Sequence, residues 1–181
     1  MAEKAPRDFI PLRIAVLTVS DTRTMEEDRS GDTLAERLKG AGHVLADRRI
    51  VTDDVEAIRG AVTAWAEDPA VDVVITTGGT GFTGRDVTPE AIEPLFEKRM
   101  EGFSAIFHRI SFEKIGTSTI QSRATAGVVR QTFVFVLPGS PGACRDAWDG
   151  ILAAQLDYRH KPCNFVEILP RLDEHLRRGA G

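Results

Sequence analysis

The chain has 181 residues, of which 42% are hydrophobic and 28% are charged, and its formal net charge is −4. This size and composition are typical of one globular domain with an ordinary core. The acidic balance argues against nucleic acid as a partner, and no apolar stretch approaches the ~18–20 residues that a membrane span needs. Because the first residues also lack the apolar core of a signal peptide, we expect a cytoplasmic protein.

The predicted elements begin after a polar segment. Residues 1–11 contain two prolines and are expected to form a mobile arm, with one domain over residues 12–172 and a C-terminal tail over residues 173–181. Residues 13–19 are rich in β-branched side chains and predict the first strand. A charged loop follows, and Ser30 is the expected N-cap of the first helix.

The next segment predicts a second strand, a helix and a third strand. Residues 43–51 form a more polar strand that belongs near a sheet edge, and residues 71–77 form a buried one. Between them, Asp53 or Asp54 is expected to cap a helix that buries Ile58, Val62 and Trp65. Asp53 has an ordinary explanation as a cap, since Glu56 lies three residues later as in a capping box. It could equally be a functional carboxylate.

A glycine-rich loop follows the third strand and is the most informative part of the sequence. After this loop, Thr88 is the expected N-cap of a helix and Pro89 its first residue. A strand, a glycine loop and a helix start together make a place where backbone N–H groups can face an anion. Asp86 could hold Mg²⁺ against a phosphate there, or it could merely orient its own loop. A plain tight turn is the competing interpretation of the glycines. The loop consists of Gly78, Gly79, Thr80 and Gly81.

The second half of the chain predicts a helix over residues 103–110, a short strand end at residues 127–129 and a buried strand over residues 132–137. Gly139 and Ser140 follow this last strand and begin a helix whose apolar face includes Cys144 and Trp148. The two cysteines, at 144 and 163, are expected to be free thiols, although the sequence leaves a disulfide open.

Strands that alternate with amphipathic helices indicate an α/β fold with a mostly parallel sheet. Ligands of such sheets bind beyond the carboxyl ends of the strands. If the strands are parallel, the polar loops that follow them all meet at one edge of the sheet. These loops begin at Ser20-Asp21, Asp53-Asp54, Gly78 and Gly139-Ser140. The sequence therefore predicts a ligand site at this edge.

The same residues resemble a known family. The segment from Thr76 to Gly81 together with Arg85-Asp86-Val87-Thr88-Pro89-Glu90 is similar to the signature of the MoaB/Mog family of molybdenum cofactor biosynthesis. The resemblance runs from about residue 9 to residue 171, and residues 112–123 and 159–165 are closest to the MoaB branch. Further matching segments are Thr18-Val19-Ser20-Asp21, Ser30-Gly31, Glu101-Gly102-Phe103 and Leu137-Pro138-Gly139-Ser140.

The resemblance implies a three-layer α/β/α sandwich that assembles as a homotrimer or a homohexamer. It also implies that molybdopterin and ATP are joined with the help of Mg²⁺ into adenylyl-molybdopterin and pyrophosphate, and that the molybdate-insertion enzyme, which uses this product, is a potential partner. A protein that only binds molybdopterin is the alternative, but the intact motif at Arg85-Asp86 favours the enzyme. Asp53 and Asp86 match the family's two functional aspartates, as catalytic and metal-binding residues. Substrate-binding roles fall on Ser20, Asp21, Ser30, Gly31, Thr77, Gly78, Gly79, Thr80, Gly81, Gly139 and Ser140.

Overall fold

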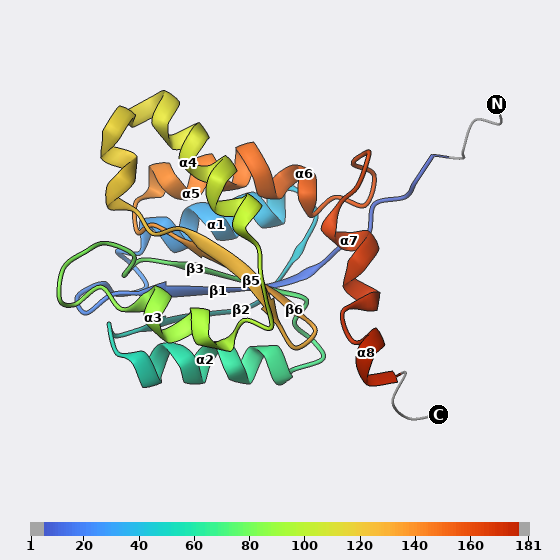
Figure 1. Ribbon diagram of the computed structural model, residues 1–181, viewed down its shortest axis with the longest axis horizontal. Coiled ribbons are helices and arrows are strands. Elements are labelled where there is room, and N and C mark those ends of the chain that lie inside the picture. Colours follow the sequence, from blue (N-terminus) through green and yellow to red (C-terminus); the bar gives the residue numbers. More distant parts are fainter. Residues whose placement is uncertain (1–5, 178–181) are drawn as a thin grey trace.

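The computed structural model describes residues 6–177, and its centre is a six-stranded sheet (Figure 1). The strand order is β2-β1-β3-β6-β5-β4. Four strands run parallel, namely β1 (Arg13–Val19), β2 (Val44–Val51), β3 (Val73–Thr77) and β6 (Thr132–Leu137). The strands β5 (Thr125–Val129) and β4 (Lys98–Arg99) extend the sheet in the antiparallel sense. The predicted mostly parallel sheet is confirmed, and β2 lies at an edge as expected.

Helices cover both faces of the sheet and make three layers (Figure 1). One face carries α1 (Arg29–Gly40), α4 (Glu101–Ile115) and α5 (Pro141–Ala147). The other face carries α2 (Val55–Glu67) and α3 (Thr88–Ile92). Alternation along β1 divides the core between them, because Ile14 and Val16 point to the first layer whereas Ala15 and Leu17 point to the second. Each face is therefore buried, as expected of a parallel sheet.

Shorter elements complete the chain. The 3₁₀ segments are η1 (Glu93–Leu95), η2 (Gly116–Gln121) and η4 (Leu169–Arg171), while η3 (Trp148–Leu152) is a π-helical turn that leads into α6 (Ala153–Gln155). The helices α7 (Phe165–Ile168) and α8 (Glu174–Arg177) end the described chain. Residues 1–5 and 178–181, the outer parts of the predicted arm and tail, lie outside the described residues.

The described part of the arm packs against the domain. Phe9 lies 5.1 Å from the ring of His43 between centroids, and Arg7 donates to the backbone oxygen of Tyr158 over 3.1 Å. Both cysteines are free thiols, with Cys144 buried and Cys163 exposed. The expected core residues Trp65, Trp148 and Cys144 are buried. In residues 6–177 we find no helix with both the length and the apolar character needed to cross a bilayer.

Two predicted helix caps are wrong. Asp28, rather than Ser30, is the N-cap of α1, because its carboxylate accepts the backbone N–H of Gly31 over 3.0 Å. Thr88 lies in the first turn of α3 after Val87, and its hydroxyl donates to a carbonyl outside the helix. In α4 the predicted apolar face is also only partly buried, since Ile106 is 51% exposed. The two cap errors have one origin, because the hydroxyls of Ser30 and Thr88 donate to carbonyls outside their own helices.

Candidate functional site at the carboxyl edge of the sheet

The loops after the four parallel strands meet at one edge of the sheet, as the sequence predicts. The N–H of Ser20, just after β1, donates to the last carbonyl of β2 at Val51 over 2.9 Å. The N–H of Gly78, after β3, donates to Leu137 at the end of β6 over 3.1 Å. A Cβ atom on Gly139 would lie only 3.1 Å from the Cα of Gly78. Four separate segments of the chain therefore form one surface.

The glycine loop owes its shape to residues that have no side chain. Gly78 and Gly79 adopt φ angles of 101° and 66°, which favour glycine. A Cβ on Gly78 would lie 2.3 Å from the carbonyl oxygen of Val19, and one on Gly79 would lie 2.3 Å from Thr88 Oγ1. Thr88 closes the loop, because its hydroxyl donates to Gly78 O over 2.8 Å and its N–H donates to Gly79 O over 3.0 Å. The backbone of the loop therefore packs closely against Val19 on one side and Thr88 on the other.

Asp53 has no part in capping the helix that follows it. The cap of α2 is Asp54, whose carboxylate accepts the N–H of Ala57 over 2.8 Å. Asp53 uses its own N–H to bind Asp21 Oδ1 over 3.0 Å. The other oxygen of Asp21 accepts from Arg85 Nε and Nη2, over 2.9 and 2.6 Å. Asp21 therefore joins the loop after β1 to the loops that carry Asp53 and Arg85, and its own carboxylate is fully engaged.

The carboxyl group of Asp53 lies in an unfavourable place for a negative charge. Partial burial raises its pKa, and the charges of Asp21 and Asp86 raise it further, against weaker opposing effects of Arg85 and a backbone hydrogen bond from Asp21. In the described part of the chain no cationic side chain forms an ion pair with it. A cation bound here would relieve the repulsion between these acids.

Asp86 is held in the opposite way. Its Oδ2 atom accepts from the N–H of Thr83 over 2.9 Å and from the hydroxyl of the same residue over 2.6 Å. Partial burial alone would raise the pKa of Asp86, but these bonds, the N–H of Gly81 and the charge of Arg123 outweigh it and lower the pKa. Asp86 is consequently ionised at neutral pH and fixed in orientation.

The two aspartates approach the same glycine loop from different strands. Asp53 Oδ1 lies 3.0 Å from the position of a Cβ on Gly79, and Asp86 Oδ2 lies 2.8 Å from that on Gly81. Among residues 6–177 no group of three or more His, Cys, Asp or Glu side chains is arranged to hold a metal ion. Two carboxylates nonetheless fit Mg²⁺, because this ion commonly keeps several waters and takes further ligands from substrate phosphates.

Other predicted substrate-binding side chains are already hydrogen-bonded within the protein. Ser20 Oγ accepts the N–H groups of Thr22 and Arg23 over 3.2 and 3.1 Å, which closes a turn after β1. Ser140 caps α5 by accepting the N–H of Ala143 over 3.1 Å, as the sequence predicts. The buried Thr77 hydroxyl donates to Pro138 O over 2.9 Å. These side chains hold loops in place, which leaves mainly backbone groups for a ligand.

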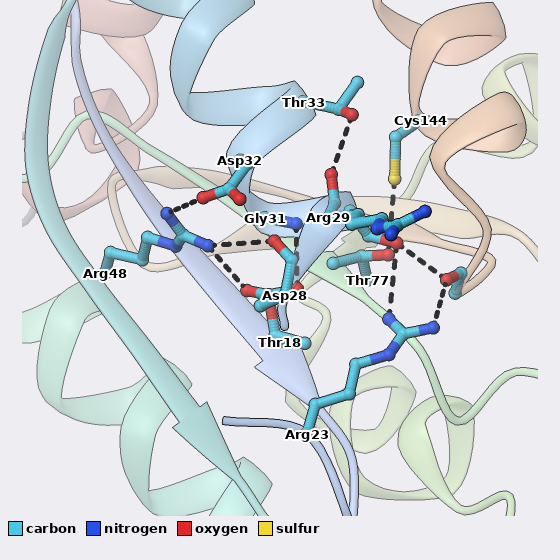
Figure 2. Close-up of polar contacts among 12 residues, drawn as sticks. Thr18, Arg23, Asp28, Arg29, Gly31, Asp32, Thr33, Arg48, Thr77 and Cys144 are labelled. Atoms are coloured by element: carbon cyan, nitrogen blue, oxygen red, sulfur yellow. Dashed lines mark hydrogen bonds and ion pairs between the residues drawn. The ribbon is translucent and has the colours of Figure 1, made fainter. Parts of the chain in front are cut away.

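Ser30 and Gly31 are buried and belong to a hydrogen-bond network that the sequence did not reveal, and Figure 2 shows Gly31 in it beside Asp28. Ser30 donates its hydroxyl hydrogen to Gly139 O over 2.7 Å, so it ties the start of α1 to the loop after β6. A Cβ on Gly31 would lie 2.1 Å from Asp28 Oδ2 and 2.8 Å from Arg48 Nη2. Gly31 is therefore explained by the close approach of these two side chains.

Asp28 and Arg48 form the centre of this network. Asp28 is fully buried, and its Oδ2 accepts from Thr18 Oγ1 over 2.7 Å and from Arg48 Nη2 over 2.9 Å. Figure 2 shows the Arg48 guanidinium between Asp28 and Asp32, the second partner at 2.7 Å. Burial would raise the pKa of Asp28, but the hydrogen bonds of Thr18, Arg48 and Gly31 lower it overall. An aspartate two residues before Ser30 is the one signal that could have indicated the cap.

Two hollows lie away from the tips of these loops. The larger, about 670 Å³, lies at the opposite edge of the sheet, beside Arg13 and Thr132, where strands begin. The second, about 660 Å³, lies between α3 and α4, where Glu90 and Arg123 line it but none of the residues Gly78 to Gly81 does. The volume of a hollow therefore does not identify the site in this fold. The glycine loop and the two aspartates meet at the carboxyl edge, and the larger hollow contains none of them. Arg123 is a further residue that the sequence analysis missed.

Comparisons with known proteins find relatives that cover most of this chain. A family model described as a probable molybdopterin binding domain matches residues 15–158. Molybdenum cofactor biosynthesis protein B of Escherichia coli K12 is 52% identical over 158 residues, which cover 87% of this chain and 93% of that protein. A crystal structure of a molybdenum cofactor biosynthesis protein B has a TM-score of 0.78 at 40% identity and covers 97% of this chain and 99% of that chain. The tungsten cofactor synthesizing protein MoaB from Pyrococcus furiosus has a TM-score of 0.70 at 34% identity, covering 90% and 97%.

Proposed function

Because this chain belongs to the MoaB/Mog family of molybdenum cofactor biosynthesis proteins, we propose that it transfers the adenylyl group of Mg-ATP to molybdopterin. The products are adenylyl-molybdopterin and pyrophosphate. One observation carries this proposal. Asp53 and Asp86 come from different strand ends and face one glycine loop at the ligand edge of a parallel sheet. That arrangement suits a nucleotide polyphosphate and its magnesium ion.

The reaction needs little covalent participation from the protein. An oxygen of the terminal phosphate of molybdopterin attacks the α-phosphorus of ATP, and the bond from that phosphorus to the bridging oxygen of the β-phosphate breaks. Pyrophosphate leaves with the electron pair of this bond, so atoms and charge balance. Most of the rate then comes from alignment of the two phosphates and from stabilisation of charge on the phosphoryl oxygens.

The residues of the site divide this work. Backbone N–H groups between Gly79 and Gly81 bind phosphate oxygens, because glycine lets the chain approach them closely, whereas the N–H of Gly78 already donates to Leu137 O. Asp53 and Asp86 hold Mg²⁺, directly or through water, and the ion supplies positive charge that neutralises the phosphates. Asp21 orients the Asp53 segment through the 3.0 Å bond to its N–H. The N–H groups near Gly139 and Ser140 remain a second place for a phosphate.

We propose further that the protein acts as a homo-oligomer, a trimer or a hexamer. Apolar side chains on α4 and η2 are strongly exposed, among them Phe112 at 56%, Ile115 at 54% and Ile120 at 71%. Apolar surface of this kind is available for contact between copies.

The test measures pyrophosphate released from ATP, Mg²⁺ and molybdopterin by the purified protein. Asp86→Asn and Asp53→Asn should each lower the rate by about 100-fold, as expected when a group that stabilises transition-state charge is lost. The matched control is Asp54→Asn, because asparagine also caps helices and this neighbouring carboxylate caps α2. Transfer at the wild-type rate by Asp86→Asn would refute the assignment. A protein that gains thermal stability from molybdopterin but releases no pyrophosphate would be a binder only.

A further inference from the structure

We propose that Arg123 is a positioning residue that sets the direction of the peptide groups in the glycine loop and thereby the orientation of Asp86. The proposal rests on the proposed function only in treating Asp86 as the carboxylate that serves the ligand. Arg123 lies between η2 and β5, in the antiparallel half of the sheet, 37 residues after Asp86. Arg123 contacts the glycine loop on the side where its carbonyls lie, away from the proposed ligand, and it is not itself a catalytic residue.

The evidence is the number of loop carbonyls that Arg123 binds. Its Nε donates to Thr80 O over 3.2 Å and to Gly81 O over 3.0 Å. Its Nη2 donates to Gly81 O over 2.7 Å and to Asp86 O over 3.2 Å. Its backbone N–H also donates to Thr80 O over 3.2 Å. The Nη1 atom forms an ion pair with Glu90 in α3. The planar fork of a guanidinium is suited to hold several acceptors in fixed directions.

Binding of the carbonyls decides where the N–H groups point. In a planar trans peptide the C=O and the next N–H point in opposite directions. Because Thr80 O and Gly81 O face Arg123, the N–H groups of Gly81 and Phe82 must face away from it. The Asp86 carboxylate lies close to this peptide, because its Oδ2 is 2.8 Å from the position of a Cβ on Gly81, and the N–H of Gly81 helps to lower the pKa of Asp86. Arg123 therefore acts on Asp86 through the backbone of the loop.

Arg123 is itself held firmly. Its side chain is 26% exposed, and its guanidinium carbon lies 5.3 Å from the centroid of the Phe82 ring. The preceding carbonyl, Ser122 O, accepts from His108 Nε2 over 3.1 Å when that nitrogen carries the ring proton. His108 belongs to α4, so the contact ties the segment to that helix. The loop thus takes its geometry from a part of the fold distant in sequence.

The same guanidinium affects the charges around the loop. The charge of Arg123 helps to lower the pKa of Asp86, and its hydrogen bond lowers that of Glu90. Without the guanidinium, the carbonyls of Thr80 and Gly81 lose their side-chain donor, so the peptide groups of the loop should no longer be held in fixed directions. A residue with only a packing role would leave the directions of these peptide groups unchanged.

The test compares Arg123→Gln and Arg123→Lys with the wild-type protein in two measurements. Amide NMR of the protein without nucleotide should show displaced Gly81 and Phe82 resonances in Arg123→Gln, with partial recovery in Arg123→Lys. In the pyrophosphate assay both variants should lose kcat by about 100-fold with a smaller change in KM, because misplacement of a catalytic group affects the transition state more than binding.

Arg130→Gln is the matched control, because Arg130 pairs with Glu67 near the opposite edge of the sheet. It should leave both measurements unchanged. Unaltered Gly81 and Phe82 amide resonances in Arg123→Gln would overturn the proposal, and if that variant does not fold, wild-type resonances together with wild-type kcat in Arg123→Lys would do so. Since the amide measurement needs no substrate, displaced Gly81 and Phe82 amides in a protein without transferase activity would keep this inference and reject the proposed function.

Discussion

Two aspartates at the same edge of the sheet, Asp28 and Asp53, have opposite surroundings. Asp28 is fully buried, accepts three kinds of hydrogen bond and pairs with Arg48 at 2.9 Å, so its pKa is lowered. Asp53 is only partly buried, and burial together with the acids Asp21 and Asp86 raises its pKa. The comparison teaches that position at a ligand edge does not make a carboxylate functional. Its partners decide whether it stabilises the fold or awaits a cation.

The free-energy cost of burying a carboxylate explains why Asp28 and Asp53 differ. A buried carboxylate is tolerated when donors and a cation surround it, and Asp28 satisfies that condition within the protein. Asp53 does not, so its environment favours either a proton or a bound cation. Natural proteins accept such local destabilisation where activity requires it. Four experiments test this contrast, and the expected change in stability decreases from the first to the last.

Replacement of Asp28 should cost the most stability. In Asp28→Ala the buried side of Arg48 loses its main partner, and breaking a buried ion pair in this way costs about 3–5 kcal/mol of unfolding free energy. Urea denaturation of wild type and variant measures the difference. A loss below about 1 kcal/mol would show that Asp32 alone suffices to compensate Arg48, and the contrast between the two aspartates would then fail.

Gly31→Ala should destabilise the same network by a smaller amount. The new Cβ would lie 2.1 Å from Asp28 Oδ2, and the carboxylate has no room to move away without losing its hydrogen bonds. We expect a loss of about 1–3 kcal/mol in the same denaturation experiment, as for other overpacked sites. Gly60→Ala is the control, because this position in α2 has open space and alanine favours helix there. Equal effects at both positions would contradict the crowding.

Asp53→Asn should act in the opposite direction. Removing one charge from a group of three acids should leave the unfolding free energy unchanged or raise it by up to about 1 kcal/mol. The wild-type Tm should rise when Mg²⁺ is added, and this response should weaken in the variant, because only a protein that binds the ion gains from it. A strong loss of stability in Asp53→Asn without Mg²⁺ would mean that the carboxylate has a structural partner after all.

The pH dependence of stability should distinguish the two aspartates by the sign of their contributions. The lowered pKa of Asp28 means that its contribution is present above the ordinary aspartate pKa of about 3.9 and is lost as pH falls through the folded-state pKa. The raised pKa of Asp53 has the reverse sign, so stability falls as pH rises from about 3.9 through its folded-state pKa. Tm measured across acidic pH should lack this second decline in Asp53→Asn. If Tm depends on pH in Asp53→Asn as it does in the wild type, the pKa of Asp53 is not raised in the folded protein.

Much of the fold could be predicted because the relevant signals are local. The strands at residues 13–19 and 132–137 were predicted at their observed bounds, since an apolar run with β-branched residues specifies a buried strand. Glycines at 78 and 79 marked a backbone that few other residues can adopt. The meeting of the four loops then followed from the parallel order of strands alone.

The caps and the partners of the aspartates could not be predicted in the same way. Asp53 and Asp54 were equivalent candidates for the cap of α2 until the backbone showed which carboxylate faces Ala57. Asp28 was overlooked because its main partner, Arg48, lies 20 residues away on another element.

The sequence was enough to place the main strands and helices along the chain and the glycine loop at the end of β3, and it carried the family resemblance, but it did not predict the short strand β4. Contacts between distant segments determine which acid is neutralised, which one lies among other acids, and how Arg123, from the segment before β5, holds the glycine loop. The physical reason is that periodicity and backbone preference are properties of neighbouring residues, whereas a hydrogen bond or an ion pair depends on which distant segments the fold brings within about 3 Å of each other.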